Sequence, residues 1–259
     1  TGLGFVDFIV NLAPVVIVIS AATLFLLKLI YKDFLKAKDE NKQKIMKMDE
    51  TITIKDTLLL KKSLIVLFIT ILGFMVHSQF HLESATIALG GAALLLVISK
   101  IDPEEILFEV EWTTIFFFMG LFILVGSLVE VGVIDNLAKK MLELTKGNLF
   151  VTTLTILWVS AIASAFLDNI PFVATMIPLI KAMTASGQLD ANPLWWALAL
   201  GACLGGNGTI IGASANVIVT GIMAREGRPV SFMSFMRIGF PMMIVSIIIS
   251  TIYLILFYV

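Results

Sequence analysis

The chain has 259 residues, of which 59% are hydrophobic and only 14% are charged. A soluble globular domain carries about 45–50% apolar and about 25% charged residues, so both values argue against that class. A net charge of −1 gives no basic surface for nucleic acid, and the single cysteine, Cys203, excludes a disulfide within this chain. Apolar runs near the roughly 20 residues of one membrane span recur along the chain, which predicts an all-α polytopic membrane protein.

Hydropathy divides the chain into a series of apolar segments separated by polar ones. In chain order, the predicted helices are 8–27, 63–76, 84–99, 112–129, 134–145, 149–167, 172–183, 194–223 and 240–259. The segment 134–145 has the pattern of an amphipathic helix on the outer membrane surface. The segment 194–223 is interrupted by glycines and polar residues, which predicts a broken helix.

Half of the basic residues lie in one polar segment. Residues 31–62 hold nine of the eighteen lysines and arginines. The positive-inside rule predicts that this segment is a cytoplasmic linker. We therefore expect 1–30 to be the end of a first repeat with one transmembrane helix, and 63–259 to be a second repeat.

An internal similarity supports this division. Gly4–Pro14 aligns with Ser231–Pro241, and each copy precedes a span rich in Ile and Val. The first copy leads toward the lysine-rich linker and the second is flanked by arginines, so the two copies are expected to have opposite orientations. Such inversion is typical of secondary transporters with inverted repeats. We expect the chain to be the C-terminal part of a longer one, with the rest of the first repeat before Thr1.

The first polar motif inside an apolar region follows the helix predicted at 149–167. Asp168 and Asn169 interrupt the apolar sequence, and Pro171 suits the first turn of a returning helix. The return from 171 to 184 is about 14 residues or roughly 21 Å of helix, too short for a core of about 30 Å. This predicts a re-entrant hairpin over about 149–184, with Asp168 or Asn169 as its cap. The alternative is a complete span followed by a surface loop.

The second motif is a glycine-rich stretch within 194–223. Each glycine costs about 1 kcal/mol relative to alanine in a helix, so a simple span would not keep several of them. We predict an unwound centre whose carbonyl and side-chain oxygens face a ligand. The alternative is a glycine-rich packing face between helices. The glycines of the predicted unwound segment are Gly205, Gly206, Gly208 and Gly212.

Three segments resemble the ion transporter superfamily, in the branch of arsenite pumps, NhaD-type sodium–proton antiporters, the melanosomal P protein and citrate-transporter-like domains. They are Glu111–Gly126, Phe166–Pro171 (Phe-Leu-Asp-Asn-Ile-Pro) and Gly205–Asn216. The resemblance implies two inverted repeats, each with a hairpin and a broken helix, in a protein that is usually a homodimer. It also implies that hairpin tips and broken helices build the ion site. The matching positions here are Ser164, Asp168, Asn169, Thr209, Ser214 and Asn216.

Two local electrostatic effects oppose each other at the hairpin. The N-terminus of the returning helix favours an anion, whereas the charge of Asp168 favours Na⁺ or H⁺. The first basic residue after the hairpin motif, Lys181, follows Asp168 by more than ten positions. We therefore rank cation (sodium)–proton antiport first, arsenite efflux second and symport of a dicarboxylate or citrate-like anion third. In the leading hypothesis Asp168 binds either Na⁺ or H⁺.

The remaining expectations follow from that hypothesis. The protein is expected to be no enzyme, to need no cofactor and to hold no metal other than a transported Na⁺. Its expected partners are the lipid bilayer, a small ion, a second copy and, for an arsenite pump, an ATPase subunit. Its expected location is the prokaryotic plasma membrane, as a multi-pass protein.

Overall fold

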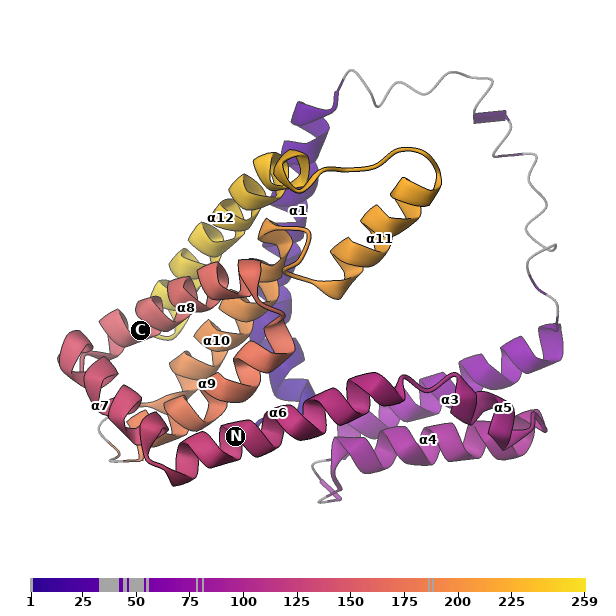
Figure 1. Ribbon diagram of the computed structural model, residues 1–259, viewed down its shortest axis with the longest axis horizontal. Coiled ribbons are helices and arrows are strands. Elements are labelled where there is room, and N and C mark those ends of the chain that lie inside the picture. The colour runs from indigo at the N-terminus through magenta and orange to yellow at the C-terminus, as the bar shows by residue number, and fades with distance from the viewer. Residues whose placement is uncertain are drawn as a thin grey trace. The chain divides into compact units, whose positions relative to one another are not determined.

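The computed structural model describes residues 2–32, 42–43, 46, 54, 56–77, 79–80, 82–185, 187 and 189–259. Within these ranges the regular secondary structure is helical, without strands (Figure 1). Five helices are long and apolar enough to cross a membrane, namely α1 (Phe5–Ile30), α3 (Thr57–Val76), α6 (Trp112–Glu130), α8 (Leu149–Phe166) and α12 (Phe232–Phe257). The prediction of an all-α polytopic membrane protein is confirmed. Most of the predicted linker at 31–62 lies outside the described residues.

The other helices in the described part of the chain are shorter than these five. They are α4 (Ser84–Ser99), α5 (Pro103–Phe108), α7 (Val133–Thr145), α9 (Asn169–Thr184), α10 (Ala191–Gly205), the 3₁₀ turn η2 (Gly206–Gly208) and α11 (Ser214–Arg225).

Several helices begin before the apolar segments that predicted them, because capping groups set the starts. α3 begins at Thr57, where the Asp56 carboxylate accepts hydrogen bonds from the N–H groups of Leu58 and Leu59. Its first turns therefore include polar residues that hydropathy had placed outside the span. α12 begins after Ser231, whose hydroxyl accepts from the Ser234 N–H, and it continues through Pro241. A side-chain cap satisfies free N–H groups in the first turn whatever the hydropathy of the next residues.

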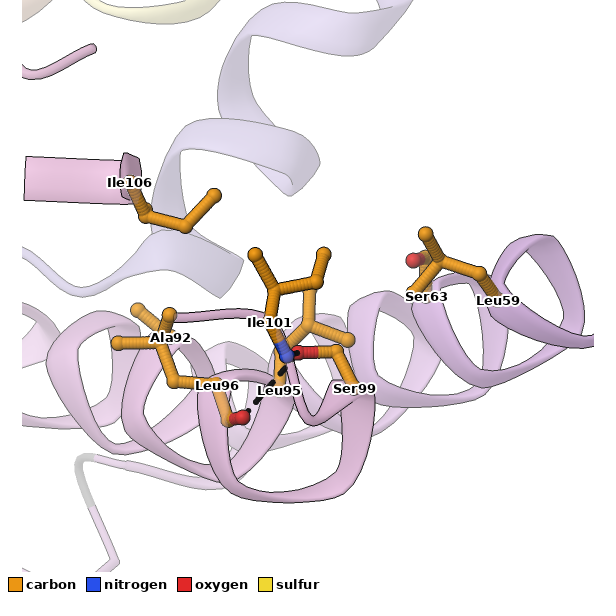
Figure 2. A pocket seen from close by; sticks show the side chains of 8 residues that line it. All are labelled: Leu59, Ser63, Ala92, Leu95, Leu96, Ser99, Ile101 and Ile106. Atoms are coloured by element: carbon orange, nitrogen blue, oxygen red, sulfur yellow. Dashed lines mark hydrogen bonds between the residues drawn. The ribbon is translucent and has the colours of Figure 1, made fainter. Parts of the chain in front are cut away.

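The chain divides into two compact units, and α1 contributes to both. The first unit contains residues 1–13 and 24–112, which include both ends of α1. Here α3 packs against α4, with Gly73 close to the side chain of Ile87, and Lys62 Nζ donates to the Ile98 carbonyl at 2.7 Å. A pocket of about 240 Å³ opens beside α3 and α4. Figure 2 shows Ser99 there, accepting from the Ile101 N–H and donating to the Leu96 carbonyl.

The second unit contains residues 14–23 and 113–259, and its core lies between α8 and α10. α10 is the most buried helix, with Leu194, Ala197 and Ala202 fully enclosed. A Cβ at Gly201 would lie 2.5 Å from the Leu157 carbonyl oxygen, so the two helices approach at backbone contact. The predicted amphipathic helix forms as α7 and packs on α9. This tightly packed core holds the end of α8 in place, where the chain turns toward α9.

Candidate functional site

A tight turn joins α8 to α9 at the first polar motif. α8 ends at Phe166, Leu167 is extended, and Asp168 caps α9 by accepting a hydrogen bond from the Ile170 N–H at 3.0 Å. Asp168 is exposed and Asn169, the first residue of α9, is partly buried. Pro171 lies in the first turn of α9, as predicted. The helical pair forms with Asp168 as its cap, while its depth in a bilayer stays a prediction.

The second motif interrupts the helix predicted at 194–223. α10 ends at Gly205, η2 makes one turn over Gly206–Gly208, and helical structure resumes at Ser214. Thr209 and Ala213 are extended. The prediction of a broken helix is confirmed, and the interruption falls at the predicted glycines.

The turn and the interruption are joined through the last residues of α8. The Thr209 hydroxyl, fully buried, donates to the Ala165 carbonyl. A Cβ at Gly212 would lie 2.7 Å from the Gly206 carbonyl oxygen and 2.9 Å from that of Ala165. The residue before Ala165 is also anchored, since the buried Ser164 hydroxyl donates to the Ala202 carbonyl at 2.7 Å. Asp168 therefore follows, by three residues, the carbonyl on which the broken helix is anchored.

Asn216 closes the interruption from its other side. Its Nδ2 donates to the carbonyls of Gly206 and Thr209, each at 2.9 Å. One amide thereby ties the first turn of α11 to η2 and to the extended residue that follows. Free carbonyls at the interrupted helix are satisfied by a side chain, as backbone groups within a membrane protein must be.

Four of the six predicted site residues fall into two groups in the structure, and the other two, Asn169 and Asn216, are partly buried. Ser164 and Thr209 are fully buried, and their hydroxyls donate hydrogen bonds to backbone carbonyls. Asp168 and Ser214 are exposed. The first group holds the site together, whereas the second is accessible to a ligand; Asn207, an exposed amide on η2 outside the predicted set, joins the second group. Their binding of an ion stays a prediction.

Thr209→Val is expected to lower stability by about 1–3 kcal/mol, because it leaves the Ala165 carbonyl without its donor in a buried place. For a chain of this size, that corresponds to a melting temperature lower by roughly 2–10 °C. Thr155→Val is the matched control, since the Thr155 hydroxyl bonds within α8 to the Val151 carbonyl. Thermal unfolding in detergent measures both, and equal shifts for the two variants would contradict the structural role of Thr209.

One expectation about charge near the motifs is wrong. On sequence distance, no basic residue lies near the hairpin motif, but Arg237 lines a pocket of about 380 Å³ with Phe166. The pocket also includes Phe240, whose ring lies 3.4 Å from a Cβ built at Gly208. Packing of α12 against α8 and η2 brings Arg237 into the same pocket as Phe166, which belongs to the first motif.

A family model described as a citrate transporter matches residues 1–201. The chain belongs to the citrate transporter family. An uncharacterized transporter of Mycobacterium bovis is 43% identical over 98% of this chain and 59% of its own length. The human P protein is 42% identical over 83% of this chain and 27% of its own length, and a 46 kDa membrane protein of Mycobacterium leprae is 39% identical over 98% and 59%.

These similarities confirm the resemblance drawn from the three segments, including that to the P protein. Membership of the citrate transporter family, together with the five long apolar helices, identifies this chain as an integral multi-pass membrane protein. The chain spans about three fifths of the length of the mycobacterial relatives that it matches.

Proposed function

We propose that the complete protein is a secondary active transporter that exchanges a cation, Na⁺ in the first place, for protons. The observation that carries the proposal is the position of Asp168. This exposed carboxylate caps α9 and follows closely the Ala165 carbonyl that anchors the helix interruption. Ionisable groups within membrane segments are rare and serve mostly in ion and proton pathways.

The exchange follows from the chemistry of one carboxylate. Asp168 accepts the Ile170 N–H through Oδ1, and Oδ2 makes no hydrogen bond within the described part of the chain. A carboxylate oxygen binds either a hard cation or a proton, so the two compete for Asp168. Two further residues offer neutral oxygens. Asn169 directly follows Asp168 at the start of α9, and Ser214 is the first residue of α11. Competition at one site, with access alternating between the two membrane sides, couples the two fluxes.

The domain organisation belongs to the same proposal. In it, 1–30 ends a first repeat, 31–62 is a cytoplasmic linker and 63–259 is a second repeat that supplies half of the ion site. The other half would come from the corresponding hairpin and broken helix of the first repeat. The mycobacterial relatives extend beyond the part that this chain matches. Assembly as a homodimer in a prokaryotic plasma membrane is proposed with it.

Symport of a citrate-like anion is the second candidate. Two observations favour it, namely the description of the matching family model and the position of Arg237 beside Phe166. Arginine binds carboxylates through bidentate hydrogen bonds. A single guanidinium among apolar side chains leaves the other carboxylates of such an anion unpaired, so we place this function second.

The deciding experiment reconstitutes the complete protein in liposomes that contain a pH-sensitive dye. Na⁺, Li⁺, K⁺, citrate and arsenite are added in turn, with an imposed proton gradient. We expect a change in internal pH on Na⁺ or Li⁺ that is absent from empty liposomes. A response to citrate alone would overturn antiport in favour of anion symport. Flux of arsenite without a cation response would establish metalloid efflux instead.

A further inference from the structure

The pocket around Arg237 combines one cation with an otherwise apolar lining. Its walls are Phe166 of α8 and Met236, Arg237, Phe240 and Pro241 of α12, which we call the Arg237 pocket. Its volume is about 380 Å³. Arg237 is exposed, and its guanidinium makes no ion pair or hydrogen bond with any residue that the structure describes. The exposed charge of Arg237 therefore lies beside a pocket whose own lining is almost wholly apolar.

The position of Arg237 along α12 limits where that charge can lie. Arg237 is the sixth residue of this long apolar helix, roughly 8 Å from its start at 1.5 Å per residue. A long basic side chain near the end of a spanning helix extends toward the membrane interface. Arg225 and Arg228 precede α12 and are also exposed, so this end of α12 is the basic, cytoplasmic one under the positive-inside rule.

The ligand that matches these features has one anionic group and an apolar body. A guanidinium binds a phosphate through two parallel hydrogen bonds, and the rings of Phe166 and Phe240 provide apolar contact. Basic pockets between transmembrane helices on the cytoplasmic side are known binding places for lipid head groups. We propose that the Arg237 pocket binds an anionic phospholipid of the inner leaflet, with its phosphate on Arg237 and the start of an acyl chain against Phe166, Phe240 and Pro241.

Contacts of α12 connect this pocket with the helix interruption. A Cβ at Gly208 would lie 3.4 Å from the ring of Phe240, and one at Gly239 would lie 2.7 Å from the Asn207 carbonyl oxygen. A lipid in the Arg237 pocket thus contacts the segment of α12 that supports η2. Occupancy of the pocket stabilises this arrangement, so anionic lipid regulates transport. That consequence rests on the proposed transport function, whereas the binding of the lipid does not.

The test compares Arg237→Gln with Arg228→Gln in the complete protein, because Arg228 is exposed but does not line the pocket. Native mass spectrometry in detergent measures retention of phosphatidylglycerol against phosphatidylcholine. We expect wild type and Arg228→Gln to retain phosphatidylglycerol and Arg237→Gln to bind it about tenfold more weakly, as loss of a charged hydrogen bond requires. Arg237→Lys, which keeps the charge, should recover part of the difference. Equal retention by Arg237→Gln and Arg228→Gln would overturn the proposal.

A second arm separates lipid from substrate as the source of the anion. Transport is measured in liposomes of phosphatidylcholine alone and with one quarter phosphatidylglycerol. We expect phosphatidylglycerol to raise the rate for wild type and Arg228→Gln but not for Arg237→Gln. An Arg237→Gln protein that needs a higher anion concentration for half-maximal transport in phosphatidylcholine alone would assign Arg237 to the substrate and overturn the lipid site. If wild type transports nothing, the proposed function fails, and the retention measurement still decides lipid binding.

Discussion

Asp168→Asn is expected to abolish cation–proton exchange while leaving the protein folded. Asparagine and aspartate are equivalent helix caps, so the side-chain oxygen can still accept the Ile170 N–H. The substitution removes the negative charge, which contributes on the order of 4 kcal/mol to a cation at 4 Å in a partly polar site. Transport should fall by at least about a hundredfold, measured as the change in internal pH after addition of Na⁺ to liposomes.

Asp190→Asn is the matched control for this prediction. Asp190 is also exposed, and it caps α10 by accepting the Asn192 N–H at 2.9 Å, in the same way that Asp168 caps α9. It lies outside both motifs, so its substitution should leave exchange within about twofold of wild type, since only a surface charge changes. Exchange at the wild-type rate in Asp168→Asn would contradict the antiport mechanism and leave Asp168 with the role of a helix cap.

Gly212→Ala is expected to have the next largest effect. Its Cβ would lie 2.7 Å from the Gly206 carbonyl oxygen and 2.9 Å from the Ala165 carbonyl oxygen. Both neighbours are backbone atoms, so relief requires the interruption to move away from α8. Overpacking of this kind costs about 1–3 kcal/mol, and the melting temperature in detergent should fall accordingly. Transport should fall more than tenfold, because the displaced segment carries the Thr209 anchor.

Gly221→Ala provides the comparison for Gly212→Ala. Gly221 lies in α11, and nothing lies within 4 Å of a Cβ built there. Alanine is favoured over glycine by up to about 1 kcal/mol within a helix, so this variant should be as stable as wild type or slightly more so. Identical melting temperatures and rates for the two variants would contradict the close approach of Gly212 to α8.

Local signals explain what could be predicted from the sequence. Hydropathy identified the apolar helices, since a segment that faces lipid must be apolar over most of its surface. The aspartate at 168 followed by Pro171 predicted a helix start, and that start occurs. Glycines beside polar residues predicted the interruption at 206–213, because helix formation there is unfavourable in itself. These features depend on neighbouring residues alone.

The tertiary structure decided which of the predicted site residues are accessible. The hydroxyls of Ser164 and Thr209 were predicted ligands, and both donate to backbone carbonyls of segments far away in sequence. A carbonyl acceptor exists at every residue, so no pattern marks Ala165 or Ala202 as the partner.

The charge near the site was decided in the same way. Arg237 meets Phe166 only because α12 packs beside the end of α8, and the distance between them along the chain hides this. The sequence by itself determined the helices, the capped turn and the interruption, since each is a property of a short segment. Packing determined that the hydroxyls of Ser164 and Thr209 hold the motifs together and that Arg237 lies beside Phe166. These residues are far apart in sequence, and only folding brings them to their partners.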